Sequence, residues 1–151
     1  MKPWQQILDD FGTRLEGWAR SCGLTTDWPI WTDQRKLYCW YNIRSLSLNT
    51  ELLLHVKVSS SGGGFWGLRP RRLDFLRNGR CQWFLVLLLG SPETGYMLPS
   101  AEVDHCTSSG VWAPGKDGSF KVHEAGLSKE FYFRSFDELT ERLHSALVIE
   151  Q

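Results

Sequence analysis

A histidine and a lysine separated by one residue, His55 and Lys57, form the pattern in this sequence with the clearest chemical content. They lie in the run from Glu51 to Val58, where apolar and polar residues alternate, which predicts a strand with one apolar face. Because successive side chains of a strand point to opposite faces, we expect His55, Lys57 and the following Ser59 to share the polar face. Polar residues at a strand end beside a glycine-rich loop are typical of sites in α/β proteins. A solvated strand face without a site is the alternative.

The segment from residue 69 to residue 80 holds five arginines and one aspartate, a local charge of +4 in a chain whose 17 basic and 17 acidic residues cancel. Guanidinium groups bind phosphate oxygens through paired hydrogen bonds, so this segment is a candidate phosphate-contacting patch. The residues expected to contact nucleic acid are Ser59, Arg69, Arg71 and Arg72. The alternative is a solvated helix whose arginines pair with the segment from residue 124 onward, which carries a charge of −3.

Aromatic residues near these positions are further candidates for contacts. Phe65 and Trp66 follow the loop Ser59–Gly64, and their rings could stack on an unpaired nucleotide base. The loop lacks the Gly-Lys-Ser/Thr ending of a phosphate-binding P-loop, so we interpret it as a connector. Trp28 and Trp31 lie in a proline-containing loop and are candidates for an exposed contact with a protein partner.

Metal-binding and membrane patterns are weak in this chain. His105, Cys106 and His123 match no zinc-ligand spacing, so we interpret them as buried or loop residues. The longest apolar run, Phe84 to Leu89, is too short to span a bilayer, and the first residues lack the apolar stretch of a signal peptide. Four dispersed cysteines without a Cys-x-x-Cys pair are typical of reduced thiols. We therefore expect a cytoplasmic protein without a membrane partner.

Hydrophobic periodicity and turn residues predict one domain over residues 1–151. The expected elements are a helix over 4–22, strands over 36–44 and 51–58, a helix over 71–77, strands over 82–89, 96–98, 120–123 and 130–133, and a helix over 136–148. This order, α-β-β-α-β-β-(loop)-β-β-α, predicts an α/β (α+β) fold with a central mixed sheet flanked by helices.

The order of elements resembles the PD-(D/E)XK nuclease superfamily, which has the restriction-endonuclease-like fold. In that family a helix and a strand hairpin precede a second helix, metal-binding acids lie near the end of one strand, and an acid and a lysine lie at positions i and i+2 of the next. The matching pair here is His55 and Lys57, with histidine in place of the acid. Asn42 precedes His55 by 13 positions, similar to the spacing in archaeal Holliday-junction resolvases, and would replace the other acid. The resemblance covers residues 4 to 98.

The replaced acids change the chemistry that the resemblance implies. Nucleases of this family hold Mg²⁺ through carboxylates, because Mg²⁺ prefers oxygen ligands, and neutral Asn42 and His55 cannot supply that charge. Glu16, on the first helix, is expected to face solvent, and Glu51 lies about 13 Å along the strand from His55. We therefore expect a degenerate catalytic site at Asn42, His55 and Lys57, with no bound metal or other cofactor.

Three functions remain open on the sequence alone. The first is a nuclease-like fold that binds DNA or RNA, or acts as a regulatory subunit, without cleaving. The second is an active Mg²⁺-dependent endonuclease whose acids lie elsewhere, for example at Asp33 or Glu51. The third is a protein-interaction module, such as an inhibitor or immunity factor, that uses its tryptophan-rich loops.

Overall fold

The computed structural model describes residues 3–27, 38–59 and 64–149. This part of the chain forms, in order, α1 (Pro3–Ser21), β1 (Thr25–Asp27), β2 (Tyr38–Ser45), β3 (Thr50–Val58), β4 (Phe65–Leu68), α2 (Pro70–Asn78), β5 (Gln82–Leu88), β6 (Gly95–Pro99), α3 (Ser100–Ser108), β7 (Phe120–His123), two 3-10 turns (Glu124–Gly126 and Lys129–Phe131), β8 (Tyr132–Phe133) and α4 (Phe136–Ile149).

Six strands form a mixed sheet in the order β1-β2-β3-β5-β6-β8. Strands β3 and β5 run parallel, and the other neighbouring pairs run antiparallel. Parallel strands need a long crossover connection, and α2 lies in the one between β3 and β5. Strands β4 and β7 pair separately as a two-stranded ribbon. The predicted α+β architecture with a central mixed sheet is confirmed.

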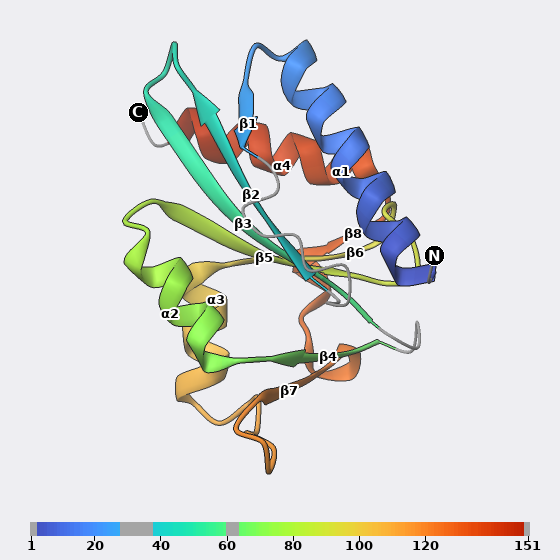
Figure 1. The fold of residues 1–151 in the computed structure, drawn as a ribbon. Helices are drawn as coiled ribbons and strands as arrows, with labels where there is room; N and C mark the ends of the chain where they lie inside the picture. The colour runs from blue at the N-terminus through green and yellow to red at the C-terminus, as the bar shows by residue number, and fades with distance from the viewer. Residues whose placement is uncertain (1–2, 28–37, 60–63, 150–151) are drawn as a thin grey trace.

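The two faces of the sheet carry different layers (Figure 1). Helices α1 and α4 cover one face, where Phe11 and Leu143 pack against the even-numbered leucines of β3. Helices α2 and α3 and the β4–β7 ribbon cover the other face, where Leu76 and Trp66 pack near Leu53. Both faces of β3 are therefore inside the protein. No helix of the described residues is long and apolar enough to cross a membrane.

The solvated-face interpretation of His55 and Lys57 is wrong. The side chain of His55 is 0% exposed and that of Lys57 is 7% exposed. Apolar residues of α2 and β4 cover this face of β3. They lie outside the β3 segment, so the alternation within β3 could not show that they would cover it. A polar residue on a strand is buried when another layer of the protein packs over it, and β3 has a packed layer on each of its two faces.

Local signals in the sequence place the helix ends correctly. Helix α1 ends in a Schellman motif, in which the N–H of Leu24 donates to the carbonyl of Ala19 and Gly23 adopts φ +72°. Helix α4 begins at the predicted capping box, where the N–H of Glu138 donates to Oγ of Ser135 over 3.2 Å. These contacts depend on neighbouring residues only, which is why the sequence predicts them.

Elements without a strong local pattern differ from the sequence prediction. Strands β1 and β4, and helix α3, lie where the sequence predicts loops, and β8 is shorter than the predicted strand over 130–133. Helix α3 buries only Val103 and Cys106, so it has almost no apolar stripe to detect. Strand β4 forms because β7 pairs with it, which is a contact between distant segments.

Candidate anion-binding site

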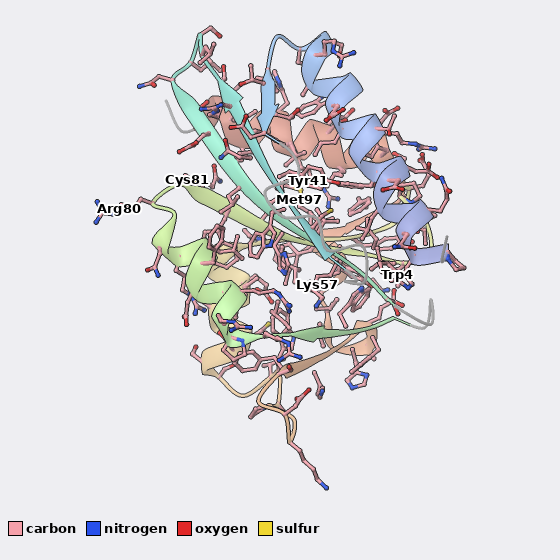
Figure 2. The ribbon with its side chains drawn as sticks, viewed as in Figure 1. Trp4, Tyr41, Lys57, Arg80, Cys81 and Met97 are labelled. Carbon is pink, nitrogen blue, oxygen red and sulfur yellow. The ribbon has the colours of Figure 1, made fainter. Side chains whose placement is uncertain are left out.

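Lys57 lies at the end of β3, at one wall of a cavity of about 230 Å³. The cavity is bounded by the end of β3, by β4 and the start of α2, and by the loop that leads into β7. Figure 2 shows Lys57 on the side of the central sheet where β4 and α2 lie. The lining residues are Lys57, Val58, Phe65, Trp66, Gly67, Arg69, Arg72, Asp117, Ser119 and Lys121.

The cavity lining is strongly basic. Four side chains that can carry positive charge, Lys57, Arg69, Arg72 and Lys121, line it together with a single carboxylate of the described residues, Asp117. Asp117 accepts hydrogen bonds from the backbone N–H of Ser119 and from Nζ of Lys121, over 3.0 and 3.4 Å. The first of these bonds is the main cause of the lowered pKa of Asp117, with Lys121 also contributing, so this carboxylate stays ionised. Among the described residues of the lining, basic side chains therefore outnumber acidic ones by four to one.

Burial and neighbouring charges make the Lys57 ammonium unfavourable. The pKa of Lys57 is lowered from 10.5 to about 7, mainly by burial and further by the guanidinium groups of Arg72 and Arg69. The ammonium form of Lys57 is therefore less favourable here than that of a lysine in water. A negatively charged ligand beside Lys57 would favour its ammonium form.

His55 lies deeper than Lys57 and does not line the cavity. Its ring stacks on the indole of Trp40, with centroids 4.0 Å apart. Burial lowers the pKa of His55 well below 6.5, and the charges of Lys57 and Arg72 lower it further, against an opposing hydrogen bond with the Cys39 backbone. A neutral imidazole beneath Lys57 can support the cavity wall, but it cannot add positive charge.

The predicted catalytic trio is only partly brought together. Asn42, His55 and Lys57 lie on adjacent strands with side chains on one side of the sheet, as predicted, because Asn42 is opposite Leu53 in the β2–β3 register. The residue directly opposite His55 is Trp40. From Leu53 to Lys57 is about 13 Å along the strand. Asn42 therefore lies too far from Lys57 to share a ligand with it.

Asn42 has local partners at its own end of the hairpin. Its Nδ2 donates to Oε2 of Glu51 over 3.2 Å and to the carbonyl of Leu52 over 3.3 Å. Glu51 thus lies beside Asn42 and away from the cavity. Glu16 is half-buried on α1, the helix on the opposite face of the sheet. Asp33, Trp28 and Trp31 lie outside the described residues.

The arginines divide into those at the cavity and those away from it. Arg69 and Arg72 line the cavity, but Arg71 is exposed and is absent from the lining. The guanidinium group of Arg77 donates to the carboxylate of Asp104 in α3 over 2.6 Å. This acidic partner precedes the segment from residue 124 onward, with which the alternative expected the arginines to pair. Arg80 lies past the far end of α2 (Figure 2). Of the five arginines in the predicted phosphate-contacting patch, only Arg69 and Arg72 line the cavity.

Two residues predicted to contact nucleic acid are buried. Trp66 is 1% exposed and its Nε1 donates to the carbonyl of Leu88 over 3.2 Å, so its ring cannot stack on a base. The sequence placed it in a loop, whereas β4 turns it into the core. Phe65, next to it, is exposed and packs near His123. Ser59 is also buried, and its Oγ has no hydrogen-bond partner within the described segments.

One side of the cavity comes from residues that the sequence pattern did not single out. Asp117, Ser119 and Lys121 belong to the hairpin-like segment before and within β7, which the sequence predicted only as a turn and a short strand. Its Asp-Gly turn was a usable signal for the hairpin itself. Nothing local indicated that β7 would pair with β4 and so place Lys121 at the same cavity as Arg72.

Metal binding finds no support in the described part of the chain. No group of three or more histidine, cysteine, aspartate or glutamate side chains there is arranged to hold an ion. His105 is exposed on α3, Cys106 is buried against Glu102, and His123 lies beside Phe65. His105, Cys106 and His123 therefore have separate surroundings and are not gathered around one ion.

Comparison with known proteins gives no family for this chain, so a function has to be inferred from the cavity described above. The chain matches no family model, no curated protein and no solved structure.

Proposed function

We propose that this protein binds the phosphate groups of nucleic acid in the cavity formed by Lys57, Arg69, Arg72 and Lys121, without cleaving the strand. The observation that carries the proposal is the convergence of these four basic residues on one cavity of about 230 Å³, with a single carboxylate among the described residues of its lining. Phosphate is the anion that arginine and lysine bind most often in nucleic-acid complexes.

A relationship to the PD-(D/E)XK nucleases belongs to the same proposal. Its support is the order of α1, the β2–β3 hairpin, α2 and β5, together with Lys57 near the end of the second hairpin strand. The positions that would hold metal-binding acids carry Asn42 and His55, and the residue facing His55 is Trp40. A stacked indole and imidazole occupy the space in which a metal would need carboxylates. We therefore propose a binding or regulatory role for this fold.

Salt-dependent binding tests the proposal. Fluorescence anisotropy with labelled single-stranded and duplex oligonucleotides should give affinities that fall steeply with salt, because bound phosphates release counterions. The double variant Arg69→Gln/Arg72→Gln should weaken binding to unrelated sequences equally, whereas Arg80→Asn, which removes one charge away from the cavity, should change it little. Oligonucleotide affinity that is absent, or equal in the double variant and the wild type, would refute the proposal.

Incubation with Mg²⁺ or Mn²⁺ tests the non-cleaving part. Plasmid and junction DNA should remain intact relative to a mock preparation, because the described residues bring one carboxylate to the cavity and no pair. Cleavage that Lys57→Ala abolishes would instead establish an active nuclease whose acids come from elsewhere in the chain.

A further inference from the structure

We propose that the protein selects single-stranded over duplex nucleic acid, because an unpaired base stacks on Phe65 while its phosphate enters the neighbouring basic cavity. This inference rests on the proposed function and names the form of nucleic acid that the same site takes. It follows from three features of the β4–β7 ribbon: an exposed aromatic ring at the cavity, an open space beside that ring, and a paired backbone that holds both.

Phe65 lies where the ribbon meets the cavity. It is 36% exposed, and it lines the cavity together with Arg69 and Lys121. Aromatic side chains beside a basic groove are the surfaces on which proteins stack unpaired bases, since every nucleobase has a flat face. A phosphate bound in the cavity would bring its own base next to this ring.

The strand pattern keeps this ring out of the core. Exposure alternates along β4, so Phe65 and Gly67 lie on the outer face while the residues between and after them are buried. In the antiparallel register, Phe65 is opposite His123 and Gly67 is opposite Lys121. Directly opposite residues share a face of the ribbon, so these four residues form one surface.

Gly67 leaves an open space beside the ring. Apart from its two chain neighbours, no atom of the described residues lies within 4 Å of the position that a Cβ would take there. Gly67 is not one of the glycines with positive φ, so the backbone does not require a glycine at this position. It lines the cavity and lies two residues from Phe65 and two from Arg69. A flat base can therefore lie over Gly67 and against the Phe65 ring.

Lys121 lies within the span of one nucleotide from this ring. It is the diagonal neighbour of Phe65 in the ribbon, and such neighbours are about 7–8 Å apart. Lys121 also contacts Asp117 over 3.4 Å and lines the cavity. A single sugar joins a base to its phosphate, so a base on Phe65 keeps its phosphate beside the basic residues of the cavity.

The ring is held on a paired backbone. The N–H of Glu124 donates to the carbonyl of Gly64 over 2.8 Å, next to the pair formed by Phe65 and His123. The rings of Phe65 and His123 contact each other, with centroids 4.9 Å apart and planes inclined by 48°. A side chain fixed in this way loses little conformational freedom when a base binds, which favours affinity.

The interior of a duplex cannot use this surface. Its bases stack on one another and present only their edges in the grooves, so no base face reaches Phe65. Phosphate contacts alone favour the duplex, because its density of negative charge is higher than that of a single strand. Tighter binding of a single strand therefore indicates contact with the bases.

The experiment compares three labelled probes of equal length: a pyrimidine single strand, the same strand with abasic sugars in place of its bases, and the corresponding duplex. Anisotropy at one salt concentration should show about tenfold tighter binding of the base-containing strand than of the abasic strand, which is within the range that one stacked base contributes. The duplex should bind more weakly than the base-containing strand.

Phe65→Ala tests the ring, and Gly67→Val tests the space beside it. Phe65→Ala should lose most of the preference for bases and keep the affinity for the abasic strand, because the basic residues are unchanged. Gly67→Val puts a side chain where the base would lie, and valine suits a strand, so it should also reduce the preference and keeps the test valid if Phe65→Ala fails to fold. Leu46→Ala is the control, because it removes a 78% exposed apolar side chain from the turn between β2 and β3 and should change neither affinity.

The outcomes separate the two proposals. Equal affinity for the base-containing and abasic strands, with steep salt dependence in both, would overturn the stacking site and leave the proposed function standing. Tighter binding of the duplex would do the same. A preference for bases that survives in both Phe65→Ala and Gly67→Val would also overturn the stacking site, because the bases would then bind elsewhere. No affinity for any of the three probes would overturn the proposed function itself.

Discussion

The indole of Trp40 and the imidazole of His55 stack face to face across the β2–β3 hairpin, with ring centroids 4.0 Å apart and ring planes inclined by 19°. Phe75 of α2 packs against the same indole, so the imidazole lies in an aromatic layer between the sheet and the helix. This environment excludes water and disfavours the imidazolium. The stack therefore explains why His55 behaves as part of the core.

Replacing His55 with phenylalanine should remove a pH dependence of stability. The pKa of His55 is well below 6.5 in the folded protein, so below pH 6.5 the unfolded chain binds a proton that the folded protein does not. The free energy of unfolding should thus fall as the pH decreases, by up to about 1.4 kcal/mol per pH unit from this residue. Urea denaturation of His55→Phe between pH 5 and pH 7 should show a shallower fall than the wild type. His144→Gln, on the exposed face of α4, is the control, and an unchanged slope in His55→Phe would contradict the prediction.

Replacing Lys57 with methionine should stabilise the free protein at neutral and acidic pH. The folded pKa of about 7 lies below the ordinary 10.5, so between these values the unfolded chain holds a proton that the folded protein has released. Wild-type stability should therefore rise from pH 7 to about pH 10, by at most about 1.4 kcal/mol per pH unit from this residue. Lys57→Met should lack that rise and exceed the wild type most at pH 6. Urea denaturation at pH 6, 8 and 10 measures both, and a less stable variant at pH 6 would count against an unfavourable Lys57 ammonium.

Neighbouring arginines on α2 should contribute unequally to binding. Arg72 lines the cavity and is half-buried, whereas Arg71 is exposed and lies outside it. Arg72→Gln should weaken oligonucleotide binding and lower the slope of log K against log salt by roughly 0.9 for each duplex phosphate that the variant no longer binds. Arg71→Gln removes the same charge from the same helix turn and should have a smaller effect. Equal reductions in affinity in the two variants, measured by anisotropy over a salt series, would mean that the helix surface binds and the cavity does not.

Trp66 should matter for stability and not for base stacking. Its ring is buried and its Nε1 donates to the Leu88 carbonyl. Trp66→Phe removes that bond and part of the packing, which should cost about 1–3 kcal/mol in the free energy of unfolding. Phe65→Ala, at the exposed neighbouring position, should cost less. Urea denaturation together with anisotropy on the folded variants tests this, and weaker binding by Trp66→Phe at unchanged stability would restore the stacking role.

Hydrophobic periodicity and the residues at helix ends were sufficient to predict those elements whose defining contacts join residues close together in the sequence. The amphipathic spacing of α1 and the Gly23 stop are confirmed, as are Pro70 at the start of α2 and the Ser135–Glu138 cap of α4. The alternation in β3 put His55 and Lys57 on one face, and the register of β2 puts Asn42 on that same side of the sheet. These features follow from the period of a helix or strand and from residues a few positions apart, which is the range over which a sequence pattern carries information.

The candidate site itself depends on contacts between distant segments. The sequence by itself determined that a lysine ends β3 and that arginines start α2. The tertiary structure decided that the β4–β7 ribbon covers this end of the sheet, which buries Lys57 and Trp66 and brings Lys121 to the cavity from 64 positions along the chain. Strand β4 contains only four residues, Phe65–Leu68, and its pairing with β7 is specified by the core that both strands share. Burial is a property of the layer that packs over a residue, so no pattern within β3 could predict it.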